Sequence, residues 1–124
     1  MKTSSAKAKG RALQNWTCEK ISELLGIEWG ADEKIAPREM GQNGTDVRLV
    51  GEAQEQFPFS VECKNQESWA FPSWIKQAKD NQKEGTDWLL VVKKNRTKPI
   101  VVMDAEVFFK LLTKHHNPFK RKGG

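Results

Sequence analysis

Residues 57–64 read Phe-Pro-Phe-Ser-Val-Glu-Cys-Lys, and this alternation of apolar and polar side chains is typical of a β-strand. Side chains on a strand point to opposite faces at every second position. One face is therefore apolar and is formed by Phe59, Val61 and Cys63. The other face is polar and is formed by Ser60, Glu62 and Lys64. The pattern predicts a strand that covers a core and presents a carboxylate and an ammonium group side by side.

A second acid precedes this strand. Asp46–Val50 also alternates, and we expect Gly51–Gln56 to connect the two strands as a hairpin, which brings Asp46 within a few ångströms of Glu62. Two carboxylates that close repel each other unless a cation lies between them, and oxygen ligands suit Mg²⁺. The neighbouring Lys64 can orient an attacking water and stabilise charge on a phosphate. These residues fit metal-assisted hydrolysis of a phosphodiester.

The remaining elements follow from apolar spacing and from helix start and stop signals. We expect a helix capped by Ser4–Ser5 and ended after Leu25 by Gly26, a short strand at Lys34–Pro37, a helix from Ser73 to about Gln82, strands buried on both faces at Trp88–Lys93 and Pro99–Met103, and a last helix at Ala105–Leu112. The residues expected to face the core are Leu13, Ile21, Leu24 and Leu25 in the first helix and Val107, Phe108, Leu111 and Leu112 in the last. This order predicts an α/β or α+β fold, a mixed sheet flanked by helices, in one domain.

Positive charge gathers at the two ends of the chain. The net charge is +5, yet residues 1–11 carry four bases and residues 110–124 carry five, with no acid in either segment. The body between them is mildly acidic. We expect one domain over residues 1–124 with basic tails at 1–11 and 113–124, either as solubilising segments or as grips on a polyanion such as DNA.

Other features exclude several classes of protein. No apolar run approaches the roughly 18 to 20 residues that span a bilayer, and the N-terminus lacks the apolar core of a secretory signal. Cys18 and Cys63 form no CxxC motif or disulfide framework. We therefore expect a cytoplasmic protein that binds no membrane.

The acids and the lysine fall in a recognisable order. Asp46 followed by Glu62-Cys63-Lys64 resembles the signature of the PD-(D/E)XK nuclease superfamily. Lys9-Gly10 in the first helix, Arg38 before the loop Gly-Gln-Asn-Gly, and the strand Ser-Val-Glu-Cys-Lys are similar to archaeal Holliday-junction resolvases and their phage relatives. The resemblance covers roughly residues 9 to 93.

This resemblance implies a restriction-endonuclease-like fold and an endonuclease that uses Mg²⁺, with Mn²⁺ able to substitute. Asp46, Glu62 and the Cys63 carbonyl would be the metal ligands, and Lys64 would activate water. The residues that would contact DNA are Lys9, Arg11, Arg38, Asn43 and Gln77. The implied substrate is four-way or other branched DNA. Symmetric cutting of a junction needs two sites, which implies a homodimer. A phage-encoded enzyme would act in the cytoplasm of the bacterial host.

The sequence departs from the family pattern in two places. Thr45 stands where a proline usually precedes the first acid, and Gln14 stands where the resolvases carry a glutamate in the first helix. Glu19 is a nearby acid, but at about 100° per residue it lies opposite the apolar arc, whereas Gln14 lies within the arc. We therefore expect Gln14 to face the site, as a residue that hydrogen-bonds water without adding charge.

Several alternatives remain open. A sequence-specific nuclease of the same fold, restriction-like or homing, needs base-reading segments that are not evident here. A DNA-binding module without catalysis is consistent with Gln14. Arg38 and Gln77 fit surface roles as well as DNA contacts, and Trp69 and Trp74 fit core or dimer packing better than stacking on bases.

Overall fold

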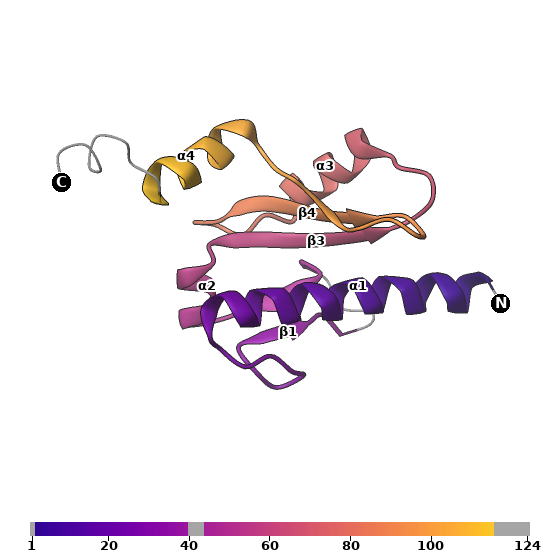
Figure 1. The fold of residues 1–124 in the computed structure, drawn as a ribbon, viewed down its shortest axis with the longest axis horizontal. Coiled ribbons are helices and arrows are strands. Elements are labelled where there is room, and N and C mark those ends of the chain that lie inside the picture. Colours follow the sequence, from indigo (N-terminus) through magenta and orange to yellow (C-terminus); the bar gives the residue numbers. More distant parts are fainter. Residues whose placement is uncertain (1, 40–43, 116–124) are drawn as a thin grey trace.

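The computed structural model describes residues 2–39 and 44–115, and Figure 1 shows helices on both sides of a small sheet. The helices and strands, in chain order, are α1 (Lys2–Leu25), β1 (Ile35–Pro37), β2 (Val47–Leu49), α2 (Glu52–Gln56), β3 (Phe59–Asn65), α3 (Phe71–Asp80), β4 (Asp87–Lys93), β5 (Ile100–Val102) and α4 (Ala105–His115). Both parallel and antiparallel strand pairs occur, which confirms the predicted mixed sheet with helices.

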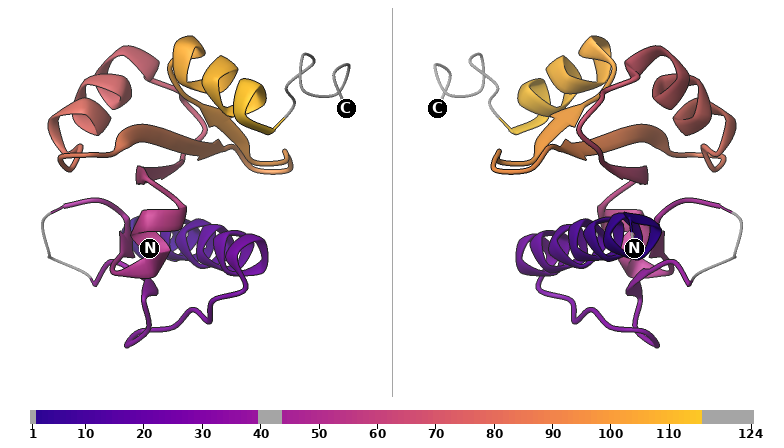
Figure 2. Two further views of the ribbon diagram at one scale, coloured as in Figure 1. Left: turned by 90° about the vertical axis from the view of Figure 1, so that its left-hand side faces the viewer. Right: turned by 90° about the vertical axis from the view of Figure 1, so that its right-hand side faces the viewer.

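The central sheet has the order β3-β4-β5. β3 and β4 are parallel, and α3 connects them. A parallel pair needs such a crossover because its strands start at the same edge. β5 is antiparallel to β4, and β1 and β2 form a separate antiparallel ribbon. The two side views in Figure 2 place this ribbon with α1 on one side of the central sheet and α3 on the other.

The predicted hairpin between the two acid-bearing strands is wrong. β2 pairs with β1, with Ile35 opposite Leu49, and the segment Glu52–Gln56 is the helix α2. Its sequence, Glu-Ala-Gln-Glu-Gln, consists of good helix formers, and Ala53 buries its methyl group in the core. Gly51 precedes it at a φ of 57°, a conformation that glycine adopts without strain. The chain therefore turns through a helix before β3 begins.

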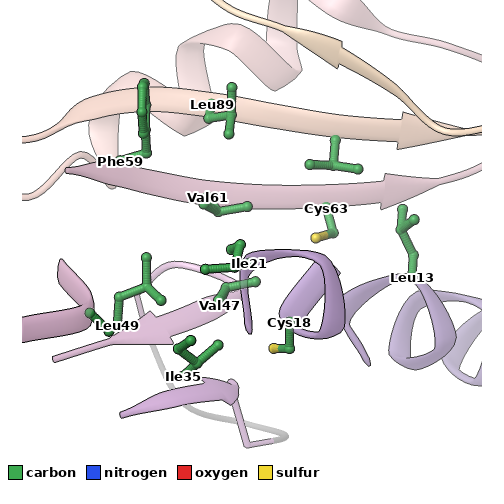
Figure 3. Packing of buried hydrophobic residues seen from close by; sticks show 12 residues of the cluster. Leu13, Cys18, Ile21, Ile35, Val47, Leu49, Phe59, Val61, Cys63 and Leu89 are labelled. Atoms are coloured by element: carbon green, nitrogen blue, oxygen red, sulfur yellow. The ribbon is translucent and has the colours of Figure 1, made fainter. Parts of the chain in front are cut away.

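Two apolar clusters cover the two faces of the sheet. The cluster toward α1 joins that helix to β2, β3 and β4, and its labelled members in Figure 3 include Leu13, Ile21, Val61 and Leu89. The cluster toward α3 contains Trp74, Ala78, Trp88, Leu90 and Val92. Trp69 is half-buried against it. Trp74 and Trp69 therefore both pack on the core, the role that the sequence favoured.

The two faces of β3 are those that the alternation predicted. Phe59, Val61 and Cys63 belong to the cluster toward α1, so Glu62 and Lys64 lie on the side of α3. The strand predicted from residues 57–64 is present as Phe59–Asn65, and the strand at 88–93 as Asp87–Lys93. These two strands form the frame that positions the candidate site.

Other expectations need correction at the ends of elements. α1 begins at Lys2, so Ser4–Ser5 lies inside the helix, and the N-terminal basic residues form its first turns. α3 begins at Phe71, two residues before the expected start, with Pro72 in its first turn. The expected C-terminal tail includes the end of α4, and its residues from 116 onward lie outside the described part of the chain.

β5 is not buried on both faces, as its apolar sequence led us to expect. Ile100 and Val101 are 45% and 55% exposed, because β5 has only one hydrogen-bonded neighbour among the described strands. Leu24 at the end of α1 is 69% exposed and borders the same apolar groove as Ile100. In α4, Val107 and Leu111 pack on the core, whereas Phe108 and Leu112 are exposed. Apolar spacing predicts a helix well, but it does not tell which side chains a short sheet can cover.

Candidate active site

Asp46 reaches β3 through backbone hydrogen bonds. It lies directly before β2, and its N–H donates to the Val61 carbonyl at 2.9 Å. In return, the Cys63 N–H donates to Asp46 Oδ2 at 2.8 Å. The expected proximity of Asp46 to Glu62 is therefore found, although the two strands do not form a hairpin.

Glu62 is almost fully buried, with 1% of its surface exposed, on the face of β3 toward α3. Its Oε2 accepts a hydrogen bond of 3.1 Å from the Asn81 side-chain amide, just after α3. Burial, and next the nearby Asp46 carboxylate, raise the pKa of Glu62 from 4.5 to about 7, although the Asn81 hydrogen bond opposes the rise. Glu62, buried beside Asp46, thus favours retaining its proton near neutral pH. A cation between the two carboxylates would offset the free-energy cost of keeping both of them ionised.

Lys64 is held in place beside the acids. Its Nζ donates a hydrogen bond of 2.7 Å to Gln77 Oε1 on α3. The sequence suggested Gln77 either as a surface residue or as part of the site, and the structure brings it to Lys64. Because Glu62 and Lys64 share one face of β3, this ammonium group lies on the same side of the sheet as the Glu62 carboxylate.

Arg38 is part of the same cluster. Its guanidinium forms an ion pair of 2.9 Å with Asp46 Oδ1 and also donates to the Gly44 carbonyl. The Arg38 side chain is 29% exposed, so it lies at the mouth of the site with one side open to solvent. Arg38 thus pairs with one of the predicted site acids, and its contact with DNA stays a prediction. Asn43, also expected near phosphate, lies outside the described residues.

The first helix presents Gln14 rather than Glu19 to this region. Gln14 is half-buried and lines a groove of about 1020 Å³ that it shares with Arg38. Glu19 is exposed. The helical phase calculated from the sequence thus agrees with the placement of both side chains.

Two basic residues near the start of α1 were expected to contact DNA. The Lys9 carbonyl accepts a hydrogen bond of 3.1 Å from the Asn65 side chain, which ties the helix to the end of β3. Arg11 lines the same groove as Gln14. Both residues therefore lie on the α1 segment that borders the site.

Cys63 contributes its backbone to the site and its side chain to the core. Its thiol donates to the Thr17 hydroxyl at 3.6 Å. Burial raises the pKa of the Cys63 thiol, so the group stays protonated and is no nucleophile. Among residues 2–39 and 44–115, no group of three or more His, Cys, Asp and Glu side chains could hold a metal ion. The two carboxylates would need further oxygen ligands from the backbone or from water.

Sequence reasoning missed Asn81. Nothing in the segment Asp80-Asn81-Gln82 indicates a role, because its link to Glu62 arises only when α3 packs against β3. An asparagine at the end of a helix is commonly a capping residue, and the Asn81 N–H does bond to the Gln77 carbonyl at 3.0 Å. Its side chain carries the contact that the sequence could not reveal.

Comparison with known proteins gives one family. A family model described as "Phage putative PDDEXK endonuclease" matches residues 5–122, nearly the whole chain. No curated protein and no solved structure matches significantly. The described part of the chain contains no helix that is long and apolar enough to cross a membrane.

Proposed function

Because the chain belongs to the phage PDDEXK endonuclease family, we propose that it cleaves DNA phosphodiesters with a divalent metal ion at Asp46, Glu62 and Lys64. The family implies a nuclease that acts on DNA. The observation that carries the assignment to these residues is the buried acid pair beside a fixed ammonium group. Buried carboxylates in contact are costly, and sites that retain them are commonly functional.

Mg²⁺ fits the donors of this site. Asp46 and Glu62 offer hard oxygen ligands, and the family pattern adds the Cys63 carbonyl. Burial and mutual repulsion raise the pKa of Glu62, so a cation is favoured where the two carboxylates meet. When bound, the ion supplies Lewis-acid polarisation of the phosphate and compensates its negative charge.

The protein's own residues would do the rest. Gln77 holds the Lys64 ammonium, which orients the attacking water and stabilises the charge that builds on the phosphate oxygens. Arg38, now paired with Asp46, is placed to bind a phosphate at the mouth of the site. Gln14 lies in the groove beside Arg38 and is a hydrogen-bonding partner for water or for the substrate.

Branched DNA is the substrate that we propose, with a homodimer as the active form. The likeness of the sequence pattern to Holliday-junction resolvases supports the substrate, and a junction is cut symmetrically only by two sites. The exposed strand β5 supports a second copy as partner, because among the described strands one of its edges is unpaired, and it lies next to an apolar groove lined by Trp16, Leu24 and Val101. If the family's phage origin holds for this chain, it acts in the bacterial host cytoplasm.

The test is cleavage of a synthetic four-way junction against a linear duplex of the same sequence, with Mg²⁺, with Mn²⁺ and with EDTA. We expect paired incisions in opposite strands of the junction, at least about tenfold faster than any cut in the duplex, and no cleavage in EDTA. Equal rates on a duplex with a fixed cut sequence would instead indicate a sequence-specific enzyme. DNA binding without cleavage under every metal would indicate a non-catalytic module, and unpaired nicks would contradict the dimer.

The role of Gln14 gives a separate prediction. Gln14→Ala should lower the cleavage rate by about tenfold, and Gln14→Glu should shift the Mg²⁺ dependence, because a third carboxylate would join the acids. Glu19→Ala, an exposed change on the same helix, should cost no more than about 0.5 kcal/mol of stability and leave the rate unchanged. Cleavage rates of the three variants, measured over a series of Mg²⁺ concentrations, show whether Gln14 or Glu19 acts at the site. An inactive Glu19→Ala with wild-type Gln14 variants would make Glu19 the first-helix acid.

A further inference from the structure

Two grooves meet at the mouth of the candidate site. The first runs along the start of α1 and is lined by Lys7, Arg11 and Gln14. The second runs past the end of α3 and is lined by Arg48, Asn81 and Lys83. Both are lined by Ala31, Pro37, Arg38 and Glu39, so they are two arms of one channel.

The acid pair lies behind residues that line the channel. Arg38 lines both arms and is ion-paired with Asp46. Asn81 lines the second arm and donates its hydrogen bond to Glu62. A chain of phosphates that follows the channel therefore passes Arg38, the partner of Asp46, between the two arms, and passes Asn81, the partner of Glu62, in the second arm.

The channel is basic. Five of its described lining residues are Lys or Arg, and Glu39 is the one acid among them. Not all of these bases serve equally. The Arg48 guanidinium donates to the carbonyls of Ala31 and Glu33, so it holds the loop at the channel wall. An excess of positive charge along a groove attracts a polyanion.

Lys83 is different, because its backbone is fixed and its ammonium is available. Its N–H donates to the Ser60 hydroxyl at 2.9 Å and its carbonyl accepts from Thr86 at 2.7 Å. Its Nζ makes no hydrogen bond or ion pair with any other described residue, and the same holds for Lys7 in the first arm. Each arm thus contains a lysine whose ammonium group has no partner among the described residues.

We propose that one DNA strand follows both arms, and that Lys7 and Lys83 bind its phosphates on opposite sides of the phosphate that is cut. This inference rests on the proposed function for the position of the cut, but not for the phosphate contacts themselves. It makes Lys83, which the sequence pattern does not distinguish, a substrate-binding residue. The two lysines, rather than the acids, then fix where a strand enters and leaves.

The first measurement is the affinity for DNA over a series of salt concentrations, without divalent metal. Lys7→Ala and Lys83→Ala should each weaken binding severalfold and reduce the slope of log affinity against log salt by about 0.7 to 0.9, the loss of one phosphate contact. Lys83→Arg, which keeps the charge, should keep the slope. The matched control is Lys76→Ala on the exposed surface of α3, which pairs with Asp80, lines neither arm and should behave as wild type. Wild-type slopes for Lys7→Ala and Lys83→Ala, or an equal loss in the control, would overturn the inference.

A second measurement tests the two sides. The cut strand is shortened stepwise from its 5′ or its 3′ end, relative to the position that the wild type cleaves. The penalty of Lys7→Ala should vanish on shortening from one end, and that of Lys83→Ala only from the other end. Loss of both penalties from the same end would contradict the channel path. If the wild type cuts nothing, the proposed function fails, while the salt slopes still decide the two lysines.

Discussion

Asp46→Asn and Glu62→Gln are each expected to reduce cleavage by roughly 100-fold or more, equivalent to about 2.7 kcal/mol of barrier, while DNA binding is kept or improved. Each change removes one of the two carboxylates that would hold the metal ion, and it also removes a charge that repels phosphate. Single-turnover cleavage together with direct titration of Mn²⁺ checks this result. The variants should bind the ion more weakly as well as cut more slowly. Wild-type turnover by either variant would contradict the site.

Glu62 supports cleavage, but without a metal ion its charge should destabilise the folded protein. The pKa of Glu62 is about 7 in the folded protein and 4.5 ordinarily, so the folded state holds its proton more tightly than the unfolded state. The contribution of this proton to the free energy of unfolding is fully present below pH 4.5 and is lost as the pH rises through about 7. Metal-free Glu62→Gln, which carries no charge, should therefore melt at a higher temperature than the wild type at pH 8.

Thermal unfolding in EDTA at pH 5 and pH 8 measures this difference. The gap between Glu62→Gln and the wild type should be larger at pH 8, and Mg²⁺ should narrow it by stabilising only the wild type. Glu19→Gln, on an exposed part of α1, is the control for a charge change without burial. A gap that does not change with pH would show that Glu62 ionises without cost in the folded protein.

Lys64→Ala is expected to lower cleavage by roughly 100-fold with little change in metal affinity. Its ammonium group contacts Gln77 rather than either carboxylate in this structure, so its loss affects the reaction more than the binding of the ion. Gln77→Ala should lower the cleavage rate by about tenfold. The Lys64 ammonium group is still present in this variant, but the hydrogen bond that fixes its position is lost. The readout is the cleavage rate at saturating metal beside the Mn²⁺ titration.

The neighbouring Lys76 gives a matched control for these variants. It lies one position before Gln77 on α3 and pairs with Asp80 at 2.9 Å, at the surface. Lys76→Ala should cleave at close to the wild-type rate. If Gln77→Ala equals Lys64→Ala, Gln77 has a role of its own in the reaction. If Lys64→Ala retains wild-type activity, Lys64 is a structural residue.

The sequence predicted best what depends on neighbours along the chain. The alternation in β3 placed Glu62 and Lys64 on one face, and the helical phase of α1 separated Gln14 from Glu19. It failed where a strand must choose a distant partner. The pairing of β2 with β1 and the helical turns of α2 depend on competition between segments that no local pattern records.

The candidate site shows the same division. Its acids and its lysine lie at spacings that can be read from the sequence. By contrast, the ion pair from Arg38 and the hydrogen bond from Asn81 appear only once the loop before β2 and the end of α3 meet β3. Gln77 is intermediate, because the helix could be predicted but the direction of its side chain could not.

The hydrogen bonds of Asp46 with Val61 and Cys63, the two neighbours of Glu62, have an evolutionary consequence. Both contacts use main-chain groups, the Val61 carbonyl and the Cys63 N–H, which every amino acid except proline supplies at position 63 and every one supplies at position 61. These two contacts thus hold Asp46 against β3 without using the side chains at positions 61 and 63. Positions 61 and 63 are then free to exchange one apolar residue for another, provided that the core still fills. Related proteins can therefore change these core residues, and with them the stability of the fold, while the main-chain contacts to Asp46 stay the same.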